Sequence, residues 1–190
     1  MQNLINYLLQ FSTLNEQQIE LVKNNVSVLK LAKGEYFSEA GKIARKVAFV
    51  NEGILRVCYY NNEGEEITRY FVDENNFAVD LNSFNNRIPS SEYIQAIIPC
   101  ELYVLSIENL RNLSNTIVSW DSIIDKITNK ALIEKVNRIS PMLAEDAKTR
   151  YLEFFKRFPN LANRVPINYL ASYIGITKYS LSRIRKDLIK

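Results

Sequence analysis

The side chains best suited to do chemistry lie near the C-terminus, on a stretch that reads TKYSLSRIRKDL at residues 177–188. Side chains three and four positions apart share one face of a helix. This face would carry lysine and arginine, and a guanidinium can donate two hydrogen bonds to the O6 and N7 atoms of guanine. The pattern predicts a helix that binds DNA in the major groove. Its predicted contacts are Thr177, Lys178, Tyr179, Ser182, Arg183 and Lys186.

Catalysis is disfavoured by what the sequence lacks. The chain has no histidine, and its only cysteines are Cys58 and Cys100. Without histidine there is no Ser-His-Asp or Cys-His nucleophile, no histidine-ligated zinc and no histidine-ligated haem. Two thiolates are too few for an iron–sulfur cluster. We therefore expect no enzyme activity, no cofactor and no metal.

Several features of the sequence bear on the cellular location of the protein. The N-terminal residues lack the basic start and small-residue cleavage site of a signal peptide. No apolar run approaches the roughly 20 residues that cross a bilayer. The two cysteines suggest no disulfide framework. These features predict a cytoplasmic protein without a membrane partner.

A basic recognition helix needs a partner helix to hold it, and the preceding residues supply one. Pro166 can begin a helix, because its missing N–H would be unpaired there in any case. Gly175 suits the left-handed conformation that ends a helix in a sharp turn. Between them lies a predicted apolar face made by Ile167, Leu170, Ala171 and Ile174.

The second helix has matching inward positions. Ile176 can fill the gap between the two helices, and Thr177 can cap the second one. The residues predicted to face inward there are Leu181, Ile184 and Leu188. This is the spacing of a helix-turn-helix. The alternative is an ordinary helical hairpin with a solvated basic face.

The charge of the chain is unevenly placed. Residues 145–190 contain ten lysines and arginines against four acidic residues, so this segment carries +6. Because the whole chain carries +3, the first 144 residues carry −3. A basic C-terminal segment on an acidic body favours a polyanion as its partner.

The middle of the chain has the pattern of a β domain. Short β-branched and aromatic runs alternate with glycine-containing turns from about residue 26 to 107. This spacing predicts a compact antiparallel sandwich or barrel. We expect strands at 26–31, 46–50, 54–60, 67–72, 93–98 and 102–106. Two helices are expected before them, at 2–11 and 15–24, with Asn15 as the N-cap of the second.

A long helix is expected after the strands. Apolar residues alternate at spacings of three and four from Ile117, as in the seam between two packed helices. These residues are Ile117, Trp120, Ile124, Ile127 and Ala131. We favour a dimer seam, and the alternative is a helix lying on the β domain. Pro141 is predicted to end this helix, and another is expected from about Glu145 to Arg157.

The chain resembles the Crp/Fnr family of bacterial transcription regulators. The resemblance rests on GITKYSLSRIRKDL (175–188), KLAKGEYFSEAGK (30–42) and FVNEGILRVCYYNNEGEEITRYF (49–71). It implies an α+β fold in which an antiparallel β-roll, like that of cyclic-nucleotide-binding proteins, precedes a dimer helix and a helix-turn-helix. The implied domains are 1–115 for sensing, 116–140 for dimerisation and 141–190 for DNA binding.

The resemblance also implies partners and roles. It predicts a homodimer on palindromic promoter DNA, contact with RNA polymerase, and a small-molecule effector or none. Arg183 matches the base-contacting arginine of the family, whereas Tyr179 stands where a glutamate is common. Because the sequence ends at Lys190, we expect no β-hairpin wing of the kind usual in the family.

The expected effector pocket departs from the cyclic-nucleotide pattern. In place of the Gly-Glu-Leu and Arg-Ser-Ala segments that cradle a cyclic phosphate, this chain has Val79-Asp80-Leu81 and Ser90-Ser91-Glu92. Glu92 would repel an anion, and Arg87 is displaced. We therefore expect a pocket that does not bind cyclic AMP. The resulting hypothesis is a dimeric DNA-binding regulator; the alternative is a ligand-binding or interaction module whose C-terminal helices serve assembly.

Overall fold

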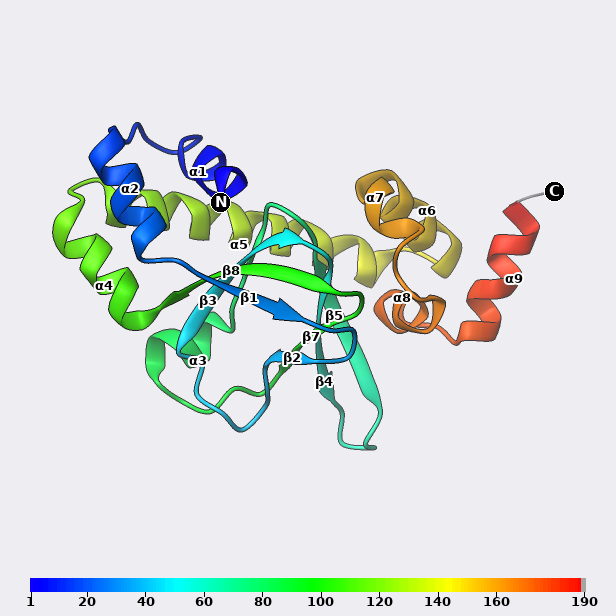
Figure 1. Cartoon of the computed structure of the whole chain (residues 1–190). Helices are drawn as coiled ribbons and strands as arrows, with labels where there is room; N and C mark the ends of the chain where they lie inside the picture. The colour runs from blue at the N-terminus through cyan, green and yellow to red at the C-terminus, as the bar shows by residue number, and fades with distance from the viewer. Residues whose placement is uncertain (189–190) are drawn as a thin grey trace.

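Two antiparallel sheets form the centre of the computed structural model, which describes residues 1–188 and their side chains except 138–144, 157 and 162. One sheet has the strand order β1-β8-β3-β6 and the other β2-β7-β4-β5 (Figure 1). The strands are β1 (Ser27–Leu31), β2 (Tyr36–Ser38), β3 (Lys46–Glu52), β4 (Leu55–Tyr60), β5 (Glu66–Val72), β6 (Phe77–Ala78), β7 (Tyr93–Ala96) and β8 (Cys100–Ser106). This confirms the predicted α+β fold with a β-roll, and β2 and β6 are strands that the sequence pattern did not predict.

The space between the sheets is filled by alternate side chains of the strands. Val57 of β4 and Ile94 of β7 are opposite each other in register and fully buried. Val50 and Leu102 make a similar pair on β3 and β8. Since alternate residues of a strand point to opposite faces, these β-branched and leucine residues leave the other face of each sheet free to pack on helices.

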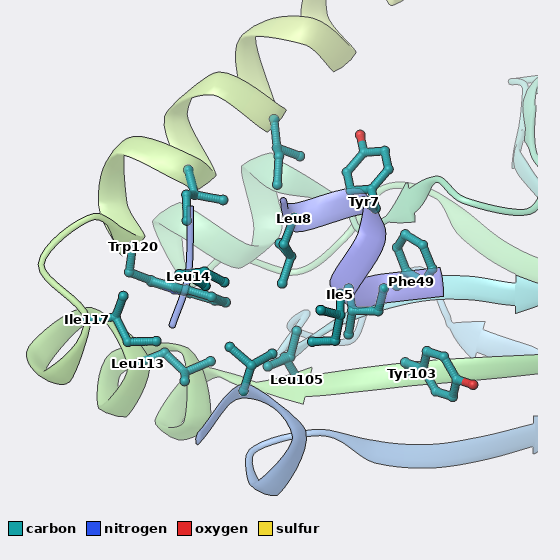
Figure 2. Close-up of a cluster of buried hydrophobic side chains, with 14 residues drawn as sticks. Ile5, Tyr7, Leu8, Leu14, Phe49, Tyr103, Leu105, Leu113, Ile117 and Trp120 are labelled. Atoms are coloured by element: carbon teal, nitrogen blue, oxygen red, sulfur yellow. The ribbon is translucent and has the colours of Figure 1, made fainter. Parts of the chain in front are cut away.

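Four helices cover the outer face of the first sheet. They are α1 (Gln2–Leu8), α2 (Glu16–Asn24), α4 (Ile107–Thr116) and the first half of α5 (Trp120–Ala144). Asn15 caps α2 as predicted: its side chain accepts from the Gln18 N–H at 2.9 Å, and Gln18 Oε1 accepts from the Asn15 N–H at 3.0 Å. Figure 2 shows Trp120 lying between α4 and α5, with Leu8 of α1 above it.

This packing corrects the prediction of a dimer seam. Ile117, Trp120 and Ile127 are each less than 8% exposed and belong to the same cluster as α1 and the sheet residues Phe49 and Leu105 (Figure 2). Their partners lie within one copy of the chain, so the prediction that these three face a second copy is wrong. The alternative, a helix lying on the β domain, describes this half of α5.

Two further details of the long helix differ from the prediction. Ile117 lies at the C-terminal cap of α4, and α5 begins only at Trp120. The helix also continues through Pro141 to Ala144, because a proline removes one backbone hydrogen bond and a helix of 25 residues keeps the bonds on either side. Ile124 packs partly buried against the core, and Ala131 is exposed.

The C-terminal part is helical and packs on the second sheet. It contains α6 (Ala147–Arg157), α7 (Pro159–Ala162), α8 (Ile167–Ile174) and α9 (Lys178–Leu188). Figure 1 shows α8 beside β5, with α9 at the end of the molecule remote from α1 and α2. Within residues 1–188, no helix is both long enough and apolar enough to cross a membrane.

Candidate nucleic-acid interface and ligand cavity

The turn between α8 and α9 has the predicted geometry. Gly175 adopts φ 77° and ψ 38°, the left-handed region that favours glycine. Its N–H donates to the Ser172 carbonyl at 3.1 Å, and the Ile176 N–H donates to the Ala171 carbonyl at 3.0 Å. These bonds close the C-terminus of α8 and turn the chain into α9.

Helix α9 begins at a capping threonine and is anchored by one leucine. The Thr177 Oγ1 accepts a hydrogen bond from the Ser180 N–H at 3.1 Å. Leu181 is fully buried against α8, and Ile184 is partly buried. Leu188, the last residue of α9, was predicted to face inward but is 39% exposed.

The outward face of α9 carries the predicted DNA contacts. Lys178, Tyr179, Ser182, Arg183 and Lys186 are all exposed, and Tyr179 is 87% exposed. Among the described residues, no carboxylate forms an ion pair with the three cations of this face. The face therefore presents cations that a phosphate backbone could neutralise. We call these five residues the basic face of α9.

Not every cation on α9 points outward. Arg185 turns toward α6, where its Nε donates to the Tyr151 hydroxyl at 2.9 Å. Tyr151 is 5% exposed and stacks edge-on against Phe155 at 4.8 Å between ring centroids. Arg185 thus helps to position α9. The sequence pattern already distinguishes it from Arg183, because residues two positions apart lie on different faces of a helix.

An aromatic cluster joins the helix-turn-helix to the β-roll. Phe71 of β5 is 3% exposed, and its ring lies 5.6 Å from Tyr173 of α8 and 6.2 Å from Phe154 of α6. Beside it the Thr68 N–H donates to the Ser172 Oγ at 2.9 Å. The C-terminal helices and the β-roll therefore share a single core in this conformation.

A buried arginine at the same contact was missed as a functional residue. Arg56 of β4 is 1% exposed, and its guanidinium bonds Glu66 at 2.7 Å and Gln95 at 3.0 Å. The guanidinium carbon also lies 3.8 Å from the ring centroid of Tyr169 on α8. A single arginine inside the apolar run ILRVCYY was the available signal, since an arginine is rarely buried without a partner.

A second ion pair links the two parts. Arg164, before α8, makes a two-pronged contact with Glu74, at 2.5 Å and 2.9 Å. Burial alone would raise the pKa of Glu74, but the hydrogen bonds from Arg164 and from the Gly53 N–H lower that pKa below its usual value. The carboxylate therefore stays ionised and paired at neutral pH.

A cavity of about 670 Å³ lies between the β-roll and α5. The predicted pocket residues Val79, Asp80, Leu81 and Ser91 line it, whereas Ser90 does not. Arg56 and Arg87 also lie outside its walls, and Arg87 is an exposed cap residue of α3 (Leu81–Asn86) with φ 57°. Neither arginine supplies the charge that a cyclic phosphate would need.

Asp80 and Ser90 have a structural role. One Asp80 oxygen accepts from the Ser83 N–H at 3.1 Å and caps α3, and the other accepts from the Ser90 hydroxyl at 2.7 Å. The Ser90 Oγ in turn accepts from the Glu92 N–H at 3.2 Å. This network places the Glu92 side chain at the cavity wall.

Glu92 is a buried carboxylate beside one arginine. It is 5% exposed and its Oε2 accepts from the Arg69 Nη1 at 3.1 Å. Burial raises the pKa of Glu92, the Arg69 guanidinium opposes that shift, and the neighbouring Asp80 carboxylate reinforces it. This wall of the cavity is therefore acidic, as Glu92 in the sequence suggested.

The comparisons with known proteins agree with this architecture. The sequence model of the cyclic nucleotide-binding domain matches residues 28–116. No curated protein matches the chain in sequence. Among solved structures, the c-di-GMP responsive global regulator CLP of Xanthomonas campestris is 17% identical, with 92% of this chain and 91% of that chain covered and a TM-score of 0.72.

Two other structures show the same fold. FixK2 from Bradyrhizobium japonicum is 15% identical, with 86% of this chain and 84% of that chain covered and a TM-score of 0.73. A transcriptional regulator of the Crp/Fnr family from Eubacterium rectale is 16% identical, with 91% and 82% covered and a TM-score of 0.68. The domain match confirms a β-roll similar to a cyclic nucleotide-binding domain, and the predicted resemblance to Crp/Fnr regulators is confirmed in the fold.

Proposed function

We propose that this chain is a DNA-binding transcription regulator of the Crp/Fnr type, which acts as a dimer on palindromic promoter DNA in the cytoplasm. The observation that carries the proposal is the basic face of α9, exposed and without ion pairs among the described residues, on a helix-turn-helix of the predicted geometry. The match of the fold to known regulators supports it.

The roles on α9 follow from reach and chemistry. Arg183 lies in the middle of the exposed face, where a helix seated in the major groove meets the base edges, and we assign it the bidentate contact to guanine. Ser182 is short and lets the helix approach closely. Lys178 and Lys186 lie one turn to either side of Ser182 and contact phosphates, while Tyr179 lies across bases or sugar.

The dimer surface belongs on another face of α5 than the sequence suggested. Leu132, Ile133 and Val136 are 47%, 62% and 65% exposed, on the second half of the helix. Apolar side chains one turn apart make a stripe that a second α5 can cover. We propose that these residues, with Ala131 at the edge, replace the buried Ile117, Trp120 and Ile127 as the contact between copies.

The cavity is proposed as the effector site, without a role for cyclic AMP. Phe71 lines the cavity and also packs on Tyr173 and Phe154. A molecule in the cavity would therefore press on a side chain that holds the helix-turn-helix. Contact with RNA polymerase is included in the proposal only because the resemblance to the Crp/Fnr family implies it.

Binding to DNA should depend steeply on salt. Each phosphate neutralised by a lysine or arginine releases counterions, so four such contacts would lower the affinity about hundredfold between 50 and 200 mM salt. We expect at least this fall in a fluorescence-anisotropy titration of the protein's own upstream DNA. An affinity that does not change with salt would exclude the basic face of α9 as the binding surface, and the absence of binding at low salt would favour assembly helices instead.

A further inference from the structure

The walls of the cavity divide into a charged group and an apolar group. The charged group contains Glu92 and three residues whose charges act on it: Arg69, Asp80 and Lys135. The apolar group includes the buried side chains of Leu8, Leu105, Trp120 and Ile127 (Figure 2 shows all but Ile127 by name). A ligand that fills both parts would have an apolar body and one polar end.

The cavity has no excess of positive charge. Three cations and four carboxylates line it: Arg69, Lys130 and Lys135, with Asp80, Glu92, Asp125 and Glu134. The cation nearest the polar end is already engaged, because Arg69 bonds Glu92 and its guanidinium carbon lies 4.8 Å from the Tyr59 ring centroid. An anion entering here would meet two buried carboxylates, Asp80 and Glu92, against one cation that forms no ion pair among the described residues, Lys135, whose Nζ lies 5.0 Å from the Tyr70 ring centroid.

Glu92 has acceptor capacity to spare. A carboxylate can accept about four hydrogen bonds, and Arg69 is the only donor to its side chain among the residues the structure describes. The Glu92 side chain is 6% exposed and lines the cavity, so bulk water has little access to the remaining acceptor positions. A donor on a ligand would satisfy this carboxylate, and a cationic donor would also offset its charge.

We propose that the cavity binds an apolar alkyl or aryl molecule that ends in an amine or hydroxyl, with this donor on Glu92 and the apolar body against Trp120. The proposal rests on the cavity's role as effector site and names the class of effector. A volume of about 670 Å³ suits a small molecule of this kind. Burial of its apolar surface contributes about 25 cal/mol per Å² to binding.

The chain carries its own reporter for this test. Trp120 is the only tryptophan and lines the cavity. We would titrate the full chain at pH 7 with octylamine, 1-octanol and octanoate, which share one alkyl chain and differ in the end group. Octylamine and octanol should each produce a saturable change in Trp120 emission, whereas octanoate should bind at least tenfold more weakly and cyclic AMP should produce no change.

Two variants separate the polar contact from the cavity itself. Glu92→Gln should lower the affinity for octylamine at least fivefold and change the affinity for octanol by less than twofold, because the amide still accepts a hydrogen bond but carries no charge. Thr128→Phe, at a partly buried position that lines the cavity, should abolish binding of both. A melting curve and the DNA titration on the same samples would show that each variant is folded.

The outcomes also distinguish this proposal from the function above. Octanoate binding as tightly as octylamine, saturable binding of cyclic AMP, or no saturable change with any of the three probes would overturn the ligand class. If DNA binding persists in those cases, the regulator stands without this class of effector. If the probes bind as expected but DNA does not, the cavity assignment stands and the proposed function fails.

Discussion

Replacing Ile133 with glutamate should convert the protein from a dimer into a folded monomer and lower its affinity for a palindromic site at least hundredfold. Ile133 is 62% exposed in one copy, so the charge costs the isolated chain little. In a dimer it would be buried without a partner and close to its own symmetry mate, which is strongly unfavourable. A monomer presents one recognition helix, and a hundredfold loss corresponds to about 2.7 kcal/mol.

The measurement is light scattering after size exclusion, followed by anisotropy on the same samples. Val118→Glu is the matched control, because Val118 is fully exposed in the loop before α5 and the same change there should leave the dimer intact. Ile124→Glu should instead lower stability, since Ile124 packs on the chain's own core. A wild-type dimer that survives Ile133→Glu would place the contact between copies elsewhere.

Replacing Phe71 with alanine should destabilise the protein by about 3–5 kcal/mol, the usual cost of removing a buried phenylalanine. The ring is 3% exposed and fills the space between β5, Tyr173 and Phe154. For a chain of this length the loss corresponds to a fall in melting temperature on the order of 10 °C. Circular dichroism during heating would measure it directly.

Tyr60→Ala is the control for that change. Tyr60 is an aromatic residue in the same sheet but is 52% exposed, so its loss should change the free energy of unfolding by about 0.5 kcal/mol or less. Equal effects of the two substitutions would mean that the C-terminal helices do not pack on β5 in solution.

The sequence was most informative where a local rule specifies one geometry. Asn15, Gly175 and Thr177 each sit at a helix end where few residue types fit, and the structure confirms all three. The outward side of α9 was also predictable, because burying Leu181 determines which side chains face away. Predicting these features requires no information about distant parts of the chain.

Long-range packing was not predictable in the same way. An apolar seam on α5 predicts that other side chains cover it. The sequence around Trp120 and Ile127 is the same whether these side chains come from a second copy or from α1 of the same copy. The exposed Ile133 and Val136 follow on the same helix without any sequence signal that sets them apart. The pairing of Arg56 with Tyr169 joins strand and helix residues more than 100 positions apart, so its partner could not be read from local pattern.

The most direct test of the account is the effect of Arg183→Ala on binding to the protein's own upstream DNA and to a scrambled sequence of equal length. Lys156→Ala serves as the charge-matched control, because Lys156 is an exposed cation on α6 and is not part of the basic face of α9. If Arg183 reads a guanine, its loss should cost about 1–3 kcal/mol on the upstream DNA and leave the scrambled DNA nearly unaffected. Equal losses on both sequences would make Arg183 a phosphate contact, and wild-type affinity in Arg183→Ala would contradict the assignment of α9 as the recognition helix.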